Sequence, residues 1–278
     1  MPCHEWSLIR FEVFRDLQGR TSPAVVNLIS PWGTLMKTRG KIQIGCSGWN
    51  YPHWKGRFYP RRLSPSEWFD YYAGSFKTVE INNTFYRLPR ASVFQKWHDQ
   101  APTGFVFSVK VSRFLTHLKK LRNVEDPLNR FLNRARLLKE HLGPLLYQLP
   151  PHWGLNLERL ESFLQLVPPD LEHVFEFRDQ SWLNTKVFKL LKKHDVSLCL
   201  HDLPGLKIDR QAIGPLAYVR FHGAARKYRH GYPDATLREW LHWMEAELKK
   251  GKRVYAYFNN DAEAHAVRDA MRLRSWTI

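Results

Sequence analysis

The stretch TVEINNTFYRLP, which begins at Thr78, places a carboxylate, two amides and a hydroxyl close together. Glu80, Asn82 and Thr84 alternate along it, so an extended strand would direct these three side chains to one face. A carboxylate can exchange a proton in general acid–base catalysis, and amides can orient a substrate by hydrogen bonds. The cluster indicates a candidate site, and other parts of the chain must supply the side chains that face it.

Eight short runs rich in β-branched and aromatic residues recur along the chain, as is typical of strands. The runs are IQIGCS (42–47), TVEINN (78–83), FVFSVK (105–110), PLLYQL (144–149), HVFEFR (173–178), VSLCLH (196–201), AYVRFH (217–222) and RVYAYFNN (253–260). Apolar spacing and capping residues predict helices between them at 64–76, 126–143, 155–167, 184–194 and 236–251.

Eight strands that alternate with helices over residues 41–278 predict an α/β fold, a closed TIM-type (β/α)₈ barrel, which typically needs roughly 250 residues. The alternative is an open doubly wound sheet. The turn GCSGW after the first run disfavours it, because this turn lacks the third glycine of a dinucleotide-binding motif. We therefore expect functional residues at the carboxyl ends of the strands, where barrels of this kind place their active sites.

Polar residues stand at the end of nearly every run. We predict general acid–base chemistry on a carboxylated or phosphorylated small molecule, with Glu80, Glu176 and His222 as catalytic residues. The predicted substrate-binding residues are Ser47, Trp49, Asn82, Tyr86, Lys110, Gln148, Arg178, Trp182, Asp202, Arg220, Tyr257, Asn259 and Asn260. The alternative is a set of paired charges that closes the barrel, with Glu80 and Lys110 neutralising each other.

The segment GAARKYRHGY (223–232) follows the seventh run and is strongly basic. The loops after the seventh and eighth strands bind phosphate in many barrels. Arg226, Lys227 and Arg229 are therefore predicted phosphate-binding residues. The same segment could equally be a solvated basic surface.

The formal net charge of +17 favours anionic partners, which leaves nucleic-acid binding or processing open as a second function. Aromatic residues near the strand ends could stack bases, and basic residues crowd the segment 113–139. The simpler interpretation of 113–139 is an amphipathic helix with a solvated face. A binding protein without catalysis is a further alternative.

No HxH or HExxH spacing and no nucleotide-binding motif occurs, so we predict no metal site and no identified cofactor. A metal enzyme stays open only because Glu80, Glu176, His201, Asp202 and His222 offer oxygen and nitrogen ligands. The three cysteines are scattered, which fits a reducing compartment. No apolar run approaches the roughly 20 residues that cross a bilayer. We expect a cytoplasmic protein with no membrane partner.

Residues 1–40 lack the rhythm of the rest and are expected to form an amino-terminal extension to a single barrel domain at 41–278. The sequence MKTRGKIQIGCSGW resembles an ordinary protein start. Met36 is therefore a candidate native start, and the intact mass of the endogenous protein would test it.

Seven motifs occur in the order in which the family of unknown function DUF72, also called YecE-like, carries them. They are IGCSGWNYPHWKGRFYP, EINNTFYRLP, FSVKVSRFLTH, LGPLLYQLPP, FEFRDQSW, YVRFHG and VYAYFNND. From about Ile42 to the carboxyl terminus the chain resembles this family. The resemblance implies a TIM-barrel-like fold and leaves the activity open.

Overall fold

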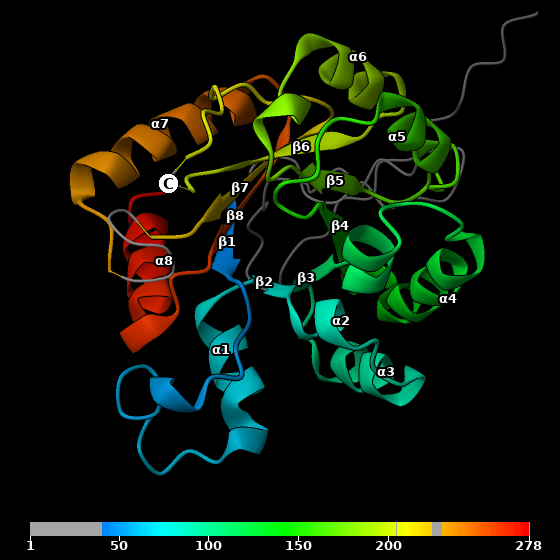
Figure 1. The fold of residues 1–278 in the computed structure, drawn as a ribbon. Helices are drawn as coiled ribbons and strands as arrows, with labels where there is room; N and C mark the ends of the chain where they lie inside the picture. Colours follow the sequence, from blue (N-terminus) through cyan, green and yellow to red (C-terminus); the bar gives the residue numbers. More distant parts are fainter. Residues whose placement is uncertain (1–40, 204, 224–229, 278) are drawn as a thin grey trace, which may run out of the picture. The chain divides into compact units, whose positions relative to one another are not determined.

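The computed structural model of the chain describes residues 41–203, 205–223 and 230–277 (Figure 1). The predicted extension, the candidate start at Met36 and the predicted phosphate-binding residues Arg226, Lys227 and Arg229 lie outside these ranges. They stay predictions.

Eight parallel strands form one sheet in the order β1-β8-β7-β6-β5-β4-β3-β2. This sheet is a nearly closed barrel with helices between its strands, which confirms the predicted TIM-type fold. Each predicted run overlaps one strand, although β4 begins two residues and β7 one residue before its run. The strands are β1 Gln43–Cys46, β2 Thr78–Ile81, β3 Val106–Lys110, β4 Leu142–Gln148, β5 His173–Glu176, β6 Ser197–His201, β7 Leu216–Phe221 and β8 Arg253–Phe258.

The seam between β1 and β2 is bridged by a side chain. The buried hydroxyl of Tyr72 accepts a hydrogen bond from the Cys46 N–H at 2.8 Å and donates one to the Thr78 carbonyl at 3.0 Å. Gly45 permits the close approach, because a Cβ atom there would lie 2.2 Å from the Thr78 carbonyl oxygen. Tyr72 therefore replaces part of the backbone ladder at this seam.

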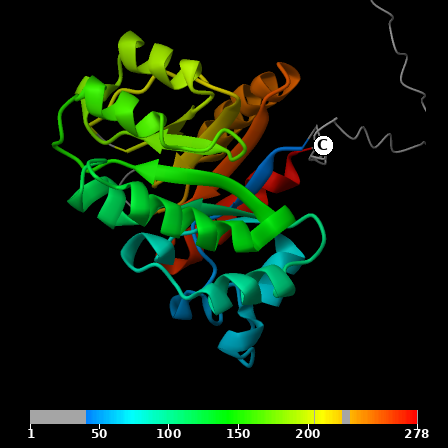
Figure 2. The same ribbon diagram turned by 90° about the vertical axis from the view of Figure 1, so that its right-hand side faces the viewer.

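The helices cover the outside of the strands (Figures 1 and 2). They are α1 Trp68–Ser75, α2 Asn83–Tyr86, α3 Ala91–Gln100, α4 Glu125–Ala135, α5 Leu157–Leu164, α6 Thr185–Lys193, α7 Asp234–Lys249 and α8 His265–Ser275. Shorter helical turns include the 3₁₀ turn Pro65–Glu67, the π-helical turn η3 Phe114–Leu118 and the 3₁₀ turn η4 Arg136–His141.

The prediction of one continuous helix over 126–143 is wrong. The backbone leaves the helical region at Lys139, with φ 46° and ψ −123°, and strand β4 already begins at Leu142. The apolar pattern of the sequence continues past the end of the helix because residues of the turn η4 are also buried against the barrel. The sequence also gave no expectation of α2, α3 or α8.

The barrel interior is filled by Val106, Leu146, Val174, Cys199, Leu216, Tyr218, Tyr255 and Tyr257. A larger apolar core lies between the strands and the helices. Three interior tyrosines are unusual in a fold whose interior is mostly Val, Ile and Leu. Buried hydroxyl groups need partners, and those of Tyr218 and Tyr257 find them among the polar side chains described below. Within the described ranges, no helix combines the length and apolarity required to cross a bilayer.

Candidate active site

Six predicted site residues meet at the carboxyl ends of the strands. We call them the charged layer: Glu80, Lys110, Glu176, Arg178, Arg220 and His222. The alternation of strand side chains places them there. Along β7, Tyr218, Arg220 and His222 all face inward, each one step closer to the carboxyl end.

Arg220 lies at the centre of the charged layer and is fully buried. Its Nε and Nη2 atoms donate to Glu80 Oε1 at 3.1 and 2.8 Å. Its Nη1 atom donates to Glu176 Oε2 at 2.7 Å. One guanidinium thus joins two carboxylates from strands β2 and β5 across the barrel.

Each carboxylate has further donors. Ser47 Oγ donates to Glu80 Oε1 at 2.7 Å, and Tyr218 OH donates to Glu80 Oε2 at 2.6 Å. Glu176 Oε1 accepts from the guanidinium of Arg178 and from Gln148 Nε2. Two more hydroxyl pairs, Tyr218 with Ser108 at 2.8 Å and Tyr257 with Thr78 at 2.6 Å, lie inside the barrel below the carboxylates. We call these four residues the floor of the site.

These contacts hold the ion pairs in their charged state. Burial alone would raise the pKa of Glu176, but Arg178 and Arg220 outweigh it and hold this pKa well below its usual range. Burial likewise acts against the charge of Arg220, and Glu80 and Glu176 outweigh it. The alternative, in which paired charges close the barrel, named Lys110 as the partner of Glu80; in the structure Glu80 pairs with Arg220.

Lys110 has a different environment from the other cations. Its side chain is buried, at 8% exposure, and Nζ lies 4.1 Å from the centroid of the Phe85 ring. Its ammonium group makes no ion pair and no hydrogen bond with any residue in the described ranges, whereas its backbone carbonyl accepts from Thr84 Oγ1 at 2.6 Å. Burial and the positive charge of Arg220 lower the pKa of Lys110 to about 7, against the partial opposition of Glu176 and Glu80.

His222 is a neutral member of the layer. Burial, reinforced by Arg220, lowers its pKa to about 4. Its Nε2 atom lies 3.1 Å from Arg178 Nη2 and 3.4 Å from Arg220 Nη1, and both of these groups are donors. Nε2 therefore accepts, and the ring proton is on Nδ1, 3.5 Å from Asp202 Oδ1. Asp202 also accepts from the His222 backbone N–H at 2.7 Å.

His117 was missed by the sequence analysis. It stands on the π-helical turn Phe114–Leu118, and its ring meets Phe85 edge-on at 5.0 Å. Since Lys110 Nζ lies over the same Phe85 ring, this contact places His117 beside the charged layer. Burial and the cations Lys110, Arg113 and Arg178 lower its pKa to about 4. The only signal in the sequence was its place at the end of the motif FSVKVSRFLTH, after the third strand.

Several predicted substrate-binding residues do not face the charged layer. Trp182 is fully buried, stacks on Phe177 and donates from Nε1 to the Trp153 carbonyl. Trp49 packs edge-on against Phe69 and Trp97. These aromatic side chains belong to the packing between strands and helices.

Three other predicted contacts are also placed differently. Tyr257 is fully buried in the floor, below the charged layer. Asn260 is fully buried and donates to Asp269 Oδ2 at 2.9 Å. Tyr86 is 71% exposed.

The remaining predicted contacts are nearer the layer. Ser47 and Gln148 bond its carboxylates directly, and Asp202 bonds His222. Asn82 donates to the Ser47 carbonyl at 3.2 Å. Asn259 is half-buried at the end of β8, where its backbone N–H donates to the Phe221 carbonyl.

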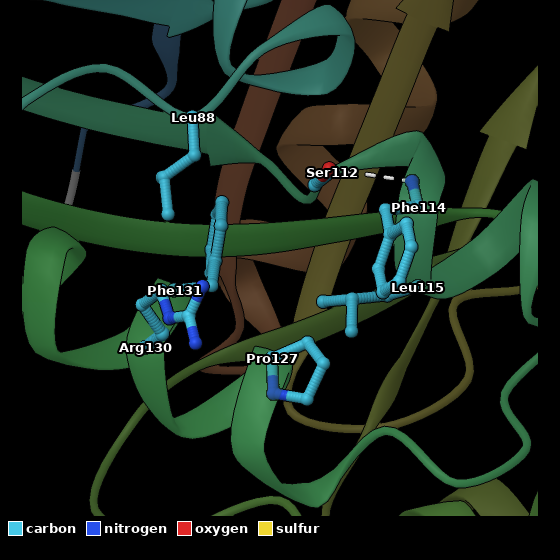
Figure 3. Close-up of a pocket in the computed structure, with 7 residues that line it drawn as sticks. All are labelled: Leu88, Ser112, Phe114, Leu115, Pro127, Arg130 and Phe131. Atoms are coloured by element: carbon cyan, nitrogen blue, oxygen red, sulfur yellow. Dashed lines mark hydrogen bonds between the residues drawn. The ribbon is translucent and has the colours of Figure 1, made fainter.

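Two hollows flank the barrel. An apolar pocket of about 420 Å³ lies between the segment after Lys110 and helix α4, lined by Leu88, Ser112, Phe114, Leu115, Pro127, Arg130 and Phe131 (Figure 3). A more polar hollow of about 680 Å³ is lined by His201, Asp202, Tyr232 and residues of the 203–210 segment. Asp202 therefore lies between this hollow and His222.

Comparison with known proteins gives a consistent answer. The model of the family described as "Protein of unknown function DUF72" matches residues 43–277. The UPF0759 protein YecE of Escherichia coli K12 is 32% identical over 138 residues, which is 49% of this chain and 48% of YecE. This chain therefore matches about half the length of that relative. The UPF0759 protein YunF of Bacillus subtilis is 22% identical over 81% of this chain and 90% of YunF.

Solved structures agree with the fold. The crystal structure of a DUF72 family protein from Thermotoga maritima is 26% identical, with a TM-score of 0.78 over 85% of this chain and 98% of that one. A DUF72 family protein from Enterococcus faecalis has a TM-score of 0.73 at 18% identity, over 84% of this chain and 94% of that one, which supports the fold alone.

Proposed function

The chain belongs to the DUF72 family, and we propose that it is an enzyme that acts on a small carboxylated or phosphorylated substrate at the charged layer, with Lys110 as its general base. The names of the relatives assign no activity. The proposal therefore depends on the geometry of the site.

The observation that carries the proposal is the environment of the Lys110 amine. It stands at the carboxyl end of β3, buried against Phe85 and without a carboxylate partner in the described part of the chain. A lysine desolvated beside other cations is the kind that enzymes use as a base or nucleophile, since much of it is uncharged at neutral pH. Its pKa of about 7 is suited to proton transfer near physiological pH.

The position of Arg178 supports the proposal that the substrate is an anion. Its side chain is 9% exposed, and it bonds Glu176 from the rim of the layer. A substrate carboxylate or phosphate could take donors from Arg178 and Gln148. In that position, the carbon or hydroxyl group from which Lys110 removes a proton would lie near the lysine amine.

Glu80 and Glu176 have another role in this proposal than the predicted acid or base. Both are fully buried and held by Arg220. They fix the Arg220 guanidinium and offset its charge. The remaining positive charge near Lys110 lowers the pKa of the lysine, and the lysine amine can still take up a proton. Both acid–base roles predicted for these carboxylates stay untested.

The experiment is untargeted mass spectrometry of a cell metabolite extract incubated with wild type, Lys110→Met and Lys119→Met. Methionine keeps the length and apolar stem of the buried lysine without its amine. Lys119 is the matched control, because it lies 5.7 Å from the Phe114 ring on the exposed surface. We expect wild type and Lys119→Met to consume the same metabolite and Lys110→Met to leave it. Consumption by folded Lys110→Met would contradict the base assignment.

Nucleic-acid binding is the second candidate, favoured by the exposed cations Arg113, Lys119, Lys120 and Arg122 that follow β3. If six phosphates are contacted, oligonucleotide affinity should fall about 10³-fold between 50 and 200 mM salt. Binding with this slope, and no metabolite turnover by wild type, would replace the proposal above.

A further inference from the structure

A second group of side chains lies at the opposite end of the strands. His98 near the end of α3, and Glu140 and His141 at the end of η4, place one potential metal-ligand atom each within 4.8 Å of one another. His141 immediately precedes β4, whereas Gln148 of the candidate active site closes that strand. We propose that His98, Glu140 and His141 bind a Zn²⁺ ion at the amino-terminal end of the barrel.

The lone pair of His141 is directed at Glu140. His141 is 5% exposed, and its Nδ1 atom lies 2.8 Å from the Phe105 carbonyl oxygen. A carbonyl only accepts, so Nδ1 carries the proton and Nε2 carries the lone pair in the neutral ring. That Nε2 atom lies 3.7 Å from Glu140 Oε1.

His98 repeats the arrangement from a different element. Its Nδ1 atom lies 2.8 Å from the Asp99 carboxylate, which only accepts, so Nδ1 carries the proton here as well. Its Nε2 atom is buried, makes no hydrogen bond within the described ranges, and lies 3.5 Å from Glu140 Oε2. The two histidine rings lie 5.5 Å apart, edge to face.

In the neutral form of both rings, two lone pairs face one carboxylate, and a cation placed between the three groups would satisfy all of them. The three ligand atoms lie within 4.8 Å of one another, and the two Nε2 atoms lie 3.7 and 3.5 Å from the two oxygens of Glu140. A tetrahedral Zn²⁺ site with bonds of about 2.1 Å has ligand–ligand distances of roughly 3.4 Å, so side-chain rotation would draw the three ligands together around the ion.

The chemistry of the ligands also favours zinc. Two imidazoles and a carboxylate are a common Zn²⁺ set, whereas Mg²⁺ prefers oxygen ligands alone. Zinc-binding histidines usually donate their other N–H to a carboxylate or a backbone carbonyl, which is the role of Asp99 and of the Phe105 carbonyl here. The protein thus supplies three ligands and both outer partners.

A bound ion would stabilise this end of the barrel. It would join the end of α3 to the turn that feeds β4, across the positive-φ residue Lys139. Since the ligands stand before β4 and the charged layer lies at its far end, the proposed role is structural and independent of catalysis at Lys110.

The test is zinc titration of the untagged, chelator-treated full chain by calorimetry, with thermal unfolding and Co²⁺ absorption as further measurements. We expect one Zn²⁺ per chain, a visible band of tetrahedral Co²⁺, a higher midpoint of unfolding with Zn²⁺, and no effect of Mg²⁺. In His141→Asn and His98→Asn the amide nitrogen can replace Nδ1 as donor while Nε2 is removed. Each should weaken zinc binding at least tenfold, and Asp99→Asn should weaken it roughly 10-fold as an outer partner.

His242→Asn is the matched control, because His242 is an exposed histidine on helix α7 outside the cluster. It should bind zinc as wild type does. The absence of one-to-one binding by wild type would overturn the proposal and leave protonated histidines paired with Glu140. Zinc binding that survives both asparagine substitutions at His98 and His141 would overturn it as well, by placing the ion elsewhere on the chain.

Discussion

The ammonium group of Lys110 faces an aromatic ring, 4.1 Å from the Phe85 centroid, where the sequence suggested a carboxylate. Glu80 and Glu176 are instead held by Arg220 and Arg178. At the scale of single residues, the site therefore contains two kinds of charge. Paired charges are fixed by several hydrogen bonds each, whereas the Lys110 amine, which meets no carboxylate among the residues that the structure describes, has a pKa lowered to about 7.

We predict that acylation of Lys110 reaches half of its maximal rate near pH 7, far below the value of about 10.4 that is typical of lysine in model peptides. Lys119 is exposed and is the reference lysine in the same digest. Only the uncharged amine reacts, so below pH 6 the Lys110 rate should fall about tenfold per pH unit. Any turnover that needs Lys110 as a base should fall in the same way. Peptide mass spectrometry after brief labelling at several pH values measures this, and equal profiles for both lysines would contradict it.

We predict that Arg220→Met lowers the free energy of unfolding by about 3–5 kcal/mol, since it leaves Glu80 and Glu176 buried without their shared cation. Arg210→Met, which removes the exposed pair with Glu239, should cost at most about 1 kcal/mol. Urea unfolding measures both. Similar values for the two variants would mean that the central ion pairs are not important for stability.

The pH dependence of wild-type stability has a defined sign. The pKa of Glu176 is depressed in the folded state, so its stabilising contribution is present above the unfolded value of about 4.3 and is lost as the pH falls through the folded value. Arg220→Met should show less of this acid sensitivity and keep the part that the pairing of Arg178 with Glu176 supplies. The measurement is urea unfolding of both proteins between pH 3 and pH 7.

At the scale of elements, strands β1 and β2 depend on a helix to complete their pairing. Tyr72 of α1 supplies both an acceptor and a donor to the two strands, and Gly45 lets them approach. Ser47 and Asn82 add side-chain contacts across the same seam, one of them to Glu80. The first and second strands carry part of the candidate site, so the seam also positions Glu80.

We predict that Tyr72→Phe costs about 1–3 kcal/mol, because it leaves the Cys46 N–H and the Thr78 carbonyl without their buried partner. Tyr71→Phe is the matched control, since Tyr71 is the neighbouring residue and is 40% exposed. It should stay within about 0.5 kcal/mol of wild type. Equal losses in urea unfolding would show that the Tyr72 hydroxyl does not hold the seam.

At the scale of the molecule, the candidate active site and the proposed zinc site lie at opposite ends of the barrel, one strand length apart. The charged layer lies at the carboxyl ends, and the proposed zinc ligands lie before the amino end of β4. A net charge of +17 would attract anions of any kind, so it does not distinguish the proposed small anionic substrate from the alternative of nucleic acid.

We predict that the two ends act independently. Saturating Zn²⁺ should raise the midpoint of thermal unfolding and leave the Lys110 labelling profile unchanged, because distant sites without shared partners contribute additively. The labelling experiment repeated with and without Zn²⁺ measures this. A shift of the Lys110 midpoint by zinc would indicate that the ion binds at the charged layer.

The sequence by itself determined the strands and the inward face of each strand. Alternation along a strand has period two, and eight such runs with helices between them leave few architectures. It therefore placed Glu80, Lys110, Glu176, Arg178, Arg220 and His222 together at the carboxyl ends. The motifs of the DUF72 family, confirmed by the match over residues 43–277, gave the same fold.

Only the tertiary structure decided the partners of these side chains. Arg220 and Glu80 are 140 residues apart, and no local pattern tells whether a buried carboxylate meets Arg220 or Lys110. The sequence likewise could not assign Trp182 to the core. An aromatic residue at that position in the sequence can line a binding site or pack between a strand and a helix, and only the structure shows that it stacks on Phe177. Alternation gives the face on which a side chain lies, whereas its pKa and its chemistry depend on distant residues that folding places within a few ångströms.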